Sequence, residues 1–422
     1  MKDICENRSN KISLLLVITF LELIFIMIWI TIPSIRSYFD GILSKGFFFL
    51  LGISSLFCAG IYSPKWLFEY IKYYFAPFIL FLVIVLGHFL FSNYDGSFLD
   101  LVNYLLVLLF IGIGLFFFNI KNRNLKKWIL IIFVIQFIIT SITTFFGLKE
   151  NMNYSRFLTS SSTSEDIRRM LERKNIGGFD FIYGITICIP AIIILSKARM
   201  NLKYKTVLLI NIIMGGLCII SANFTIAYLL LSLNIIVFLL PYKVNTIKFT
   251  RLFFCCTLAI IFLGKPLITI ILKILLNNIP SILTQEKIIK LLSFLEGKIS
   301  LYEVTSRIEL LINSVKSILK NPFFGVGAYY NSFQIVGGHN QLIDEIARYG
   351  ILGFIFIFFP IFYYAKTIIK SLKNNWGKNA YMISFIFFLL LGCINPMFGY
   401  FISLVIFVIL PITISYLDEK YS

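Results

Sequence analysis

The chain has 422 residues, of which 59% are hydrophobic and only 14% are charged. Soluble domains are roughly 45–50% apolar and about 25% charged. This composition therefore excludes a large soluble domain and indicates an integral membrane protein. A net charge of +18 would suggest a nucleic-acid partner in a soluble protein. Here the basic residues cluster between apolar runs, so we expect no nucleic-acid partner.

Apolar runs between charged breaks predict an all-α fold of about 12 transmembrane helices in a single polytopic domain, residues 1–422. About 20 apolar residues are needed to cross the hydrocarbon core of a bilayer. The runs begin near Ile12, Ser44, Tyr73, Leu99, Trp128, Phe179, Thr206, Phe224, Leu252, Gly350, Tyr381 and Phe398. The first run is long for a signal-peptide core and lacks a small-residue cleavage site, so we expect a retained helix.

The basic residues alternate between the two sides of this topology. One side carries 21 Lys and Arg, in loops that include 121–127, 197–205, 243–251 and 366–378, whereas the short loops of the other side carry only Arg36 and Lys45. Short cytoplasmic loops are enriched in Lys and Arg. The pattern predicts that both termini are cytoplasmic and that two long segments, 149–178 and 277–348, are external.

Several kinds of site find no support in the sequence. The seven cysteines fall in predicted helices or near the N-terminus, no Cys-x-x-Cys occurs, and there are only two histidines. These features argue against a zinc site. The outer segments contain no Asp-x-Asp pair for a divalent cation, and the chain has no Gly-rich loop of the ATPase type. We therefore expect neither a metal ion nor a cofactor.

The larger external segment contains an amphipathic helix pattern from Ser306 to Lys320. Ser306 and Glu309 have the spacing of a capping box, and Asn321-Pro322 predicts the end of the helix. Arg307 then lies in the first turn. Helix starts favour anions, and a guanidinium there is suited to a phosphate. The alternative for Arg307 is an interfacial contact with lipid headgroups.

His339 precedes a second helix pattern that leads into the tenth apolar run. A helix start disfavours an imidazolium, so a neutral ring there is a competent proton acceptor. The alternative is a hydrogen-bonded surface histidine without a catalytic role. His88 lies within an apolar run and is interpreted as a packing or pore-side residue. Asp344 and Glu345 precede Arg348 by four and three residues, which predicts a salt bridge within the helix.

Four short motifs occur in order between Ser306 and Gly353. They are the Arg-led helix start Ser306–Leu310, the Pro-x-x-Gly-x-Gly sequence Pro322–Gly327, the pair His339-Asn340, and the Gly-x-x-Gly sequence Gly350–Gly353. Together they resemble the motifs of the O-antigen ligase and O-antigen/capsular polysaccharide polymerase superfamily. Arg173, which precedes Gly177-Gly178, resembles the arginine–glycine stretch in the family's other external loop, and Arg156, Arg168 and Arg169 are alternatives for that role.

The resemblance implies a metal-independent, inverting glycosyl transfer from a polyprenyl-diphosphate-linked glycan donor. In that interpretation His339 deprotonates or orients the acceptor hydroxyl, while Arg307 and Arg173 bind the diphosphate. The implied location is the bacterial plasma membrane, with the active site on its external face. The implied partners are the carrier-linked donor and acceptor and the lipid bilayer, and a chain-length regulator and a flippase are further candidates.

Three functions remain open at this stage. A polymerase moves the glycan onto another carrier-linked repeat unit. The Phe-, Ile-, Lys- and Asn-rich composition is typical of an AT-rich genome, often that of a Gram-positive cell without lipopolysaccharide, and it therefore favours a polymerase. A ligase moves the finished glycan to a different acceptor. A transporter or lipid flippase would share the span count, but such proteins place charges at the membrane midplane. Here only Glu22, Lys265 and Lys273 are obvious candidates for that depth.

Overall fold

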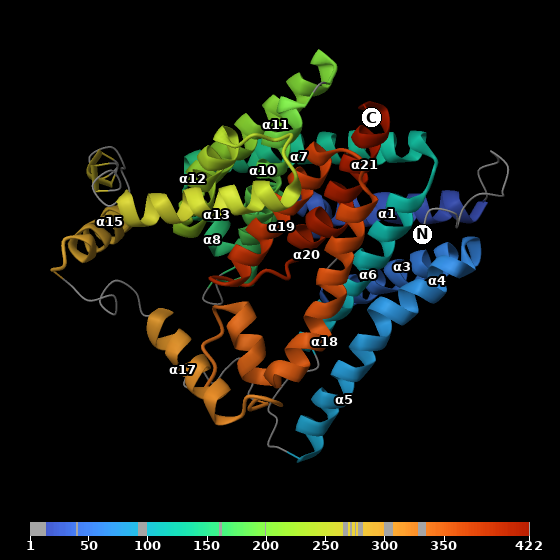
Figure 1. Ribbon diagram of the computed structural model, residues 1–422, viewed down its shortest axis with the longest axis horizontal. Helices are drawn as coiled ribbons and strands as arrows, with labels where there is room; N and C mark the ends of the chain where they lie inside the picture. Colours follow the sequence, from blue (N-terminus) through green and yellow to red (C-terminus); the bar gives the residue numbers. More distant parts are fainter. Residues whose placement is uncertain are drawn as a thin grey trace.

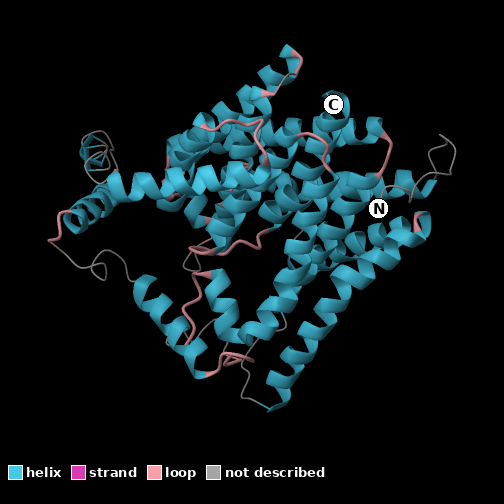
Figure 2. Ribbon diagram, viewed as in Figure 1, coloured by secondary structure: helices cyan, strands magenta, loops and turns pink. Residues whose placement is uncertain are grey.

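The structure is a computed structural model that describes residues 14–38, 41–91, 99–159, 163–198, 200–264, 269, 270, 272–274, 276, 282–298, 307–327 and 335–421. These described residues form helices joined by turns and short connections, and no strand occurs among them (Figures 1 and 2). Eight helices within this part are long and apolar enough to cross a membrane. The chain is an all-α membrane protein, as the sequence predicts.

The described helices follow one another in chain order. They are α1 Leu14–Thr31, α2 Pro33–Arg36, α3 Gly41–Tyr62, α4 Pro64–Tyr70, the π-helix η1 Ile71–Phe75, α5 Ala76–Phe91, α6 Leu99–Asn119, α7 Arg123–Glu150, α8 Tyr154–Phe157, α9 Glu165–Arg173, α10 Phe179–Lys197, α11 Leu202–Ser221, α12 Thr225–Leu239, α13 Thr246–Leu263, α15 Ile282–Leu295, α17 Arg307–Lys320, α18 Gln341–Ser371, α19 Asn375–Gly392, α20 Tyr400–Leu404, the π-helix η2 Val405–Ile409 and α21 Leu410–Tyr421.

Each predicted apolar run coincides with a helix. Eight runs fall in the candidate spans, and those near Ser44 and Phe224 fall in α3 and α12, whose apolar stretches are shorter. The runs near Leu252 and Tyr381 lie in α13 and α19. The helical character of the runs is therefore confirmed, while the count of 12 spans stays a prediction.

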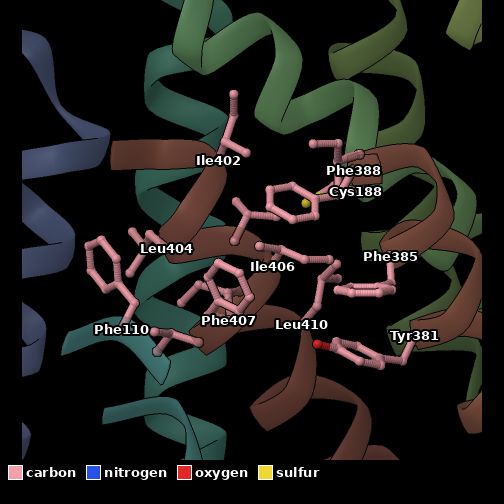
Figure 3. Packing of buried hydrophobic residues seen from close by; sticks show 14 of the residues in the cluster. Phe110, Cys188, Tyr381, Phe385, Phe388, Ile402, Leu404, Ile406, Phe407 and Leu410 are labelled. Carbon is pink, nitrogen blue, oxygen red and sulfur yellow. The ribbon is translucent and has the colours of Figure 1, made fainter. Parts of the chain in front are cut away.

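The C-terminal helices α20, η2 and α21 lie at the centre of the bundle. In the span Tyr400–Tyr421, 94% of the apolar window is buried by other helices. Figure 3 shows Ile406 and Phe407 of η2 between Phe110 of α6 and the aromatic rings of α19. The rings of Phe388 and Phe407 meet edge to face at 5.6 Å between centroids, a favourable aromatic geometry. Close packing of this kind holds helices together in lipid.

The helices at the periphery carry large apolar side chains on their outer faces. Leu50 and Phe57 of α3 are 65% and 66% exposed, and Val83 of α5 is 61% exposed. Such side chains are costly in water but match the acyl chains of a bilayer. The outer faces of α3 and α5 are therefore the surfaces that contact lipid.

The loops richest in Lys and Arg meet at one end of the bundle, which we call the basic end. Its contacts are Lys126 Nζ to Glu419 Oε1 at 2.6 Å, Lys373 N–H to Asp418 Oδ2 at 2.7 Å, Lys420 Nζ to Tyr204 Oη at 2.9 Å, and Asn375 Nδ2 to Lys243 O at 3.2 Å. The C-terminus and α11 mark this end at the top of Figure 1. Loops that the charge pattern assigns to one side are thus neighbours in space.

The end of α7 and the starts of α10 and α18 lie at the opposite end, since each of these helices has one terminus at either end, and they adjoin the two long segments predicted to be external. We call this the motif end. Its contacts include Arg36 Nη2 to Glu172 Oε1 at 2.8 Å, Phe401 N–H to Asp180 Oδ2 at 2.6 Å, Met397 N–H to Gln341 Oε1 at 2.6 Å, and His88 Nε2 to Phe324 O at 2.6 Å. In Figure 1, α17 and the first part of α18 project at the bottom of the view.

This arrangement predicts the outcome of cysteine labelling. In a variant whose native cysteines are replaced, we expect Lys320→Cys to react with a membrane-impermeant maleimide in intact cells and Lys127→Cys to react only after permeabilisation. Both lysines are exposed and lie at opposite ends of the bundle, so accessibility reports the side of the membrane. Labelling of position 127 but not of position 320 would contradict the external placement of the motif end.

Candidate active site

The Pro-x-x-Gly-x-Gly sequence forms a turn that is hydrogen-bonded to the backbone of α18. The bonds are Val326 N–H to Ala347 O at 2.9 Å, Gly327 N–H to Arg348 O at 3.0 Å, Ile351 N–H to Pro322 O at 2.8 Å, and Leu352 N–H to Phe323 O at 3.2 Å. Two motifs about 25 residues apart are therefore joined through main-chain groups. The turn, Pro322–Gly327, is called the docked turn below.

Two glycines make this close approach possible. Gly350 interrupts α18 with φ 68° and ψ −179°, a conformation essentially restricted to glycine. A Cβ on Gly350 would lie 2.1 Å from Phe323 O, and a Cβ on Gly325, at φ 77°, would lie 2.2 Å from Arg348 O. Because neither position has room for a side chain, both motif glycines are explained by the packing of backbone on backbone.

His88 anchors the docked turn from the other side. Its Nε2 lies 2.6 Å from Phe324 O. A carbonyl oxygen can only accept, so Nε2 carries the proton in this contact. His88 is therefore a packing residue at the end of α5, in agreement with the interpretation from the sequence, and it joins α5 to the motif end.

The segment before α18 is fixed by Asp344. Its Oδ2 accepts the Asn340 N–H at 2.8 Å, and its Oδ1 accepts the Ser314 hydroxyl at 2.5 Å. The Ser314 hydroxyl oxygen in turn accepts the Gly337 N–H at 2.9 Å. Ser314 belongs to α17, so a single carboxylate connects α17, the segment around His339 and the first turn of α18.

His339 is half-buried next to this connection. The Asp344 carboxylate interacts electrostatically with His339 and with Arg348, and Arg348 itself is only 3% exposed. Buried charges of this kind are stable only when opposite charges or hydrogen bonds surround them. Arg348, for which helical spacing predicts a salt bridge, thus belongs to a polar cluster with Asp344 and His339.

The described part of α17 begins at Arg307, and α17 ends at Lys320 directly before Asn321-Pro322. The predicted cap Ser306 and the side chain of Arg307 lie outside the described part of the structure. Arg307 precedes Ser314 by two turns, about 10 Å along a helix axis. The backbone therefore places Arg307 on the same helix as Ser314, which contacts the polar cluster through Asp344.

The other external segment contains the remaining arginine candidates. Arg156 donates to Asn223 O, and Arg169 pairs with Glu165 at 3.0 Å. Arg168 is half-buried, whereas Arg173 is exposed at the last residue of α9. Arg173 is thus the most accessible guanidinium of this group.

Lys174 adds a second exposed cation beside Arg173. Its Nζ hydrogen-bonds Glu150 Oε2 at 2.9 Å. This bond raises the pKa of Lys174, so the ammonium stays charged at neutral pH. The end of α9 is therefore a cationic surface at the motif end.

The connection between α19 and α20, which precedes Tyr400, links the two external segments. Gln341 Oε1 accepts the Met397 N–H at 2.6 Å. Asp180, at the start of α10, accepts the N–H groups of Phe401 at 2.6 Å and Ile402 at 3.1 Å. The structure therefore brings His339 together with Asp344 and Arg348, whereas Arg173 belongs to a second group, on α9, which packs against α2 and α8.

Sequence reasoning did not identify Asp344, Ser314, Gln341 or Asp180 as site-forming residues. A partial signal existed for Asp344, because an acid in the first turn after His339-Asn340 suits a helix start. The contacts of Ser314 and Gln341 are tertiary and leave no local pattern. No protein-family model and no curated protein matches the chain.

Proposed function

We propose that the chain is a polysaccharide polymerase of the bacterial plasma membrane. It transfers a polyprenyl-diphosphate-linked glycan onto a carrier-linked repeat unit, with inversion at the anomeric carbon and without a metal ion. The observation that supports this proposal is the docked turn on the Gly350 kink, which joins the end of α17 to α18, the helix that follows His339. The same residues carry the resemblance to the O-antigen ligase and polymerase superfamily.

In the proposed reaction, an acceptor sugar hydroxyl attacks the anomeric carbon of the donor. A bond forms between the hydroxyl oxygen and that carbon, and the bond from the carbon to the diphosphate oxygen breaks with its electron pair. His339 takes the hydroxyl proton or holds the hydroxyl in line. Arg307 and Arg173 stabilise the charge that develops on the leaving diphosphate.

The apolar outer faces of α3 and α5 support a lipid-linked substrate, because an isoprenoid tail can lie against them while the sugar reaches the motif end. Two of the midplane charges that a transporter would need already have protein partners. Ser54 donates to Glu22 at 2.6 Å, and Lys273 lies 3.9 Å from Glu296. Lys265 lies outside the described residues. We therefore favour an enzyme over a transporter.

The direct test is polymer formation by purified protein in lipid nanodiscs supplied with carrier-linked repeat units. We expect a ladder of carrier-linked glycans of increasing length. Transfer of glycan only to a different acceptor would identify a ligase. Movement of the carrier-linked unit across the bilayer without a new glycosidic bond would identify a flippase, and either result would overturn the proposal.

Arg307→Lys is expected to lower the rate of polymer formation by roughly 30-fold or more. An ammonium keeps the charge but cannot form the paired hydrogen bonds of a guanidinium with phosphate. A loss of about 2 kcal/mol in transition-state stabilisation corresponds to this factor. The matched control is Arg251→Lys, an exposed arginine at the basic end, which should leave the rate unchanged. Full activity of Arg307→Lys would mean that Arg307 only contacts lipid headgroups.

A further inference from the structure

Asp344 is a buried carboxylate whose contacts lie entirely within the motif end. It is only 2% exposed. One oxygen accepts the Ser314 hydroxyl at 2.5 Å and the other accepts the Asn340 N–H at 2.8 Å. A carboxylate has about four acceptor sites, so these two bonds leave capacity for further donors. The nearby donors are those of His339 and Arg348, with which the carboxylate interacts electrostatically.

The charges around Asp344 come from several elements. Glu345 and Arg348 lie on the same helix and are 2% and 3% exposed. Tyr104 of α6 interacts with Glu345, and Ser314 reaches Asp344 from α17. Two carboxylates therefore lie near one guanidinium, and His339 is the group that can supply a second positive charge. The ionisation of Asp344 therefore depends on the charge of His339, and the ionisation of His339 depends on the charge of Asp344.

We propose that Asp344 is a positioning residue, whose carboxylate holds the backbone at Asn340, directly after His339, against Ser314 of α17 and so sets the position of His339 before α18. The inference rests on the proposed function for the nature of the acceptor, but these hydrogen bonds do not depend on that function. A carboxylate near an imidazole also favours the charged form of the ring. A correctly oriented imidazole is what a sugar hydroxyl needs as a proton acceptor.

The first arm of the test measures the titration of the His339 ring by NMR, without any substrate. The chain contains only two histidines, so protein labelled with ¹³C-histidine gives two ring signals by NMR, and His339→Ala assigns them. In Asp344→Asn we expect the titration midpoint of His339 to fall by about one pH unit, because a nearby carboxylate favours the imidazolium. The signal of His88, which is anchored on Phe324, should stay in place.

The matched control is Asp418→Asn at the basic end. Asp418 is also buried, at 3% exposure, and accepts the N–H groups of Lys373 and Asn374 at 2.7 and 3.1 Å. This variant loses a similar structural carboxylate far from His339. It should leave both histidine titrations unchanged, so a general loosening of the fold is distinguished from a local effect.

The second arm measures polymer formation. Asp344→Asn should lower kcat about 10-fold or more while KM for the carrier-linked unit changes less than about 3-fold, since positioning acts on the reacting geometry. The acid limb of the pH–rate profile should move to lower pH together with the His339 midpoint. Asp344→Glu, which restores the charge, should recover part of the rate.

The two arms separate the two proposals. A His339 midpoint that does not move in folded Asp344→Asn, or that moves equally in Asp418→Asn, overturns the positioning role. A shifted midpoint in a protein whose wild type forms no polymer overturns the proposed function and supports the positioning role. If Asp344→Asn does not fold, Ser314→Ala removes the hydrogen bonds that hold Asp344 and Gly337 in place while keeping the charge. The chemical shifts of the His339 ring should then change, and unchanged shifts overturn the inference.

Discussion

Replacing His339 with alanine is expected to leave a folded, membrane-inserted protein that accumulates single carrier-linked repeat units and forms no polymer. The rate should fall about 10²-fold or more, the usual effect of losing a positioned acid or base. The measurement is the length distribution of glycans formed in nanodiscs from purified carrier-linked units. Addition of EDTA to the wild-type protein should leave the rate unchanged, since the proposed mechanism uses no metal ion.

The second histidine provides the contrast. His88 donates an N–H from Nε2 to Phe324 O, and the longer amide side chain of glutamine can place a donor at a similar reach. His88→Gln should therefore cost at most a few-fold in rate. Undiminished polymer from His339→Ala, or a strict need for a divalent cation, would contradict the mechanism.

Gly350→Ala is expected to lower activity by about 10²-fold or more while the helical bundle persists. The added Cβ would lie 2.1 Å from Phe323 O and would require a backbone conformation essentially restricted to glycine. Strain of this kind costs about 1–3 kcal/mol, and separating the docked turn from α18 relieves it. The position of His339 relative to α17 is then lost. Activity and thermal unfolding in detergent should be measured together.

Gly216→Ala is the control for this prediction. Gly216 lies in α11, and a Cβ there would meet nothing within 4 Å. Alanine in a helix is more favourable than glycine by about 1 kcal/mol, so activity should be retained and stability unchanged or slightly raised. Equal activity of Gly350→Ala and Gly216→Ala would mean that the docked turn has no part in catalysis.

The fold class follows from the sequence because hydropathy is a local property. Each apolar run becomes a helix, and the end of α17 at Lys320 agrees with the amphipathic pattern and with Asn321-Pro322. Backbone hydrogen bonds within a helix satisfy every polar group that lipid would leave unpaired. For this reason apolar stretches of sufficient length have few alternatives to helix.

The candidate site was less predictable because its contacts are tertiary. An asparagine before a helix predicts a side-chain cap, but Asn340 makes no such bond, and its N–H is bonded by Asp344 instead. Main-chain hydrogen bonds join the docked turn to α18, and in the sequence such bonds are indicated only by the glycines that they require. Arg173 shows how far the sequence alone can predict the site. It was chosen by its resemblance to a family motif, and the structure shows only that it is exposed at the end of α9.

The burial of α20, η2 and α21 has a consequence for biosynthesis. The span Tyr400–Tyr421 is the most buried of the candidate spans, yet the ribosome delivers it after the helices that surround it. Those earlier helices enter the bilayer first, and lipid occupies the space between them until this span is inserted. Asp180 and Gln341 find their N–H donors only on the stretch from Met397 to Ile402. A nascent protein thus inserts before α10 and α18 are linked through this stretch, and assembly of the candidate site follows insertion.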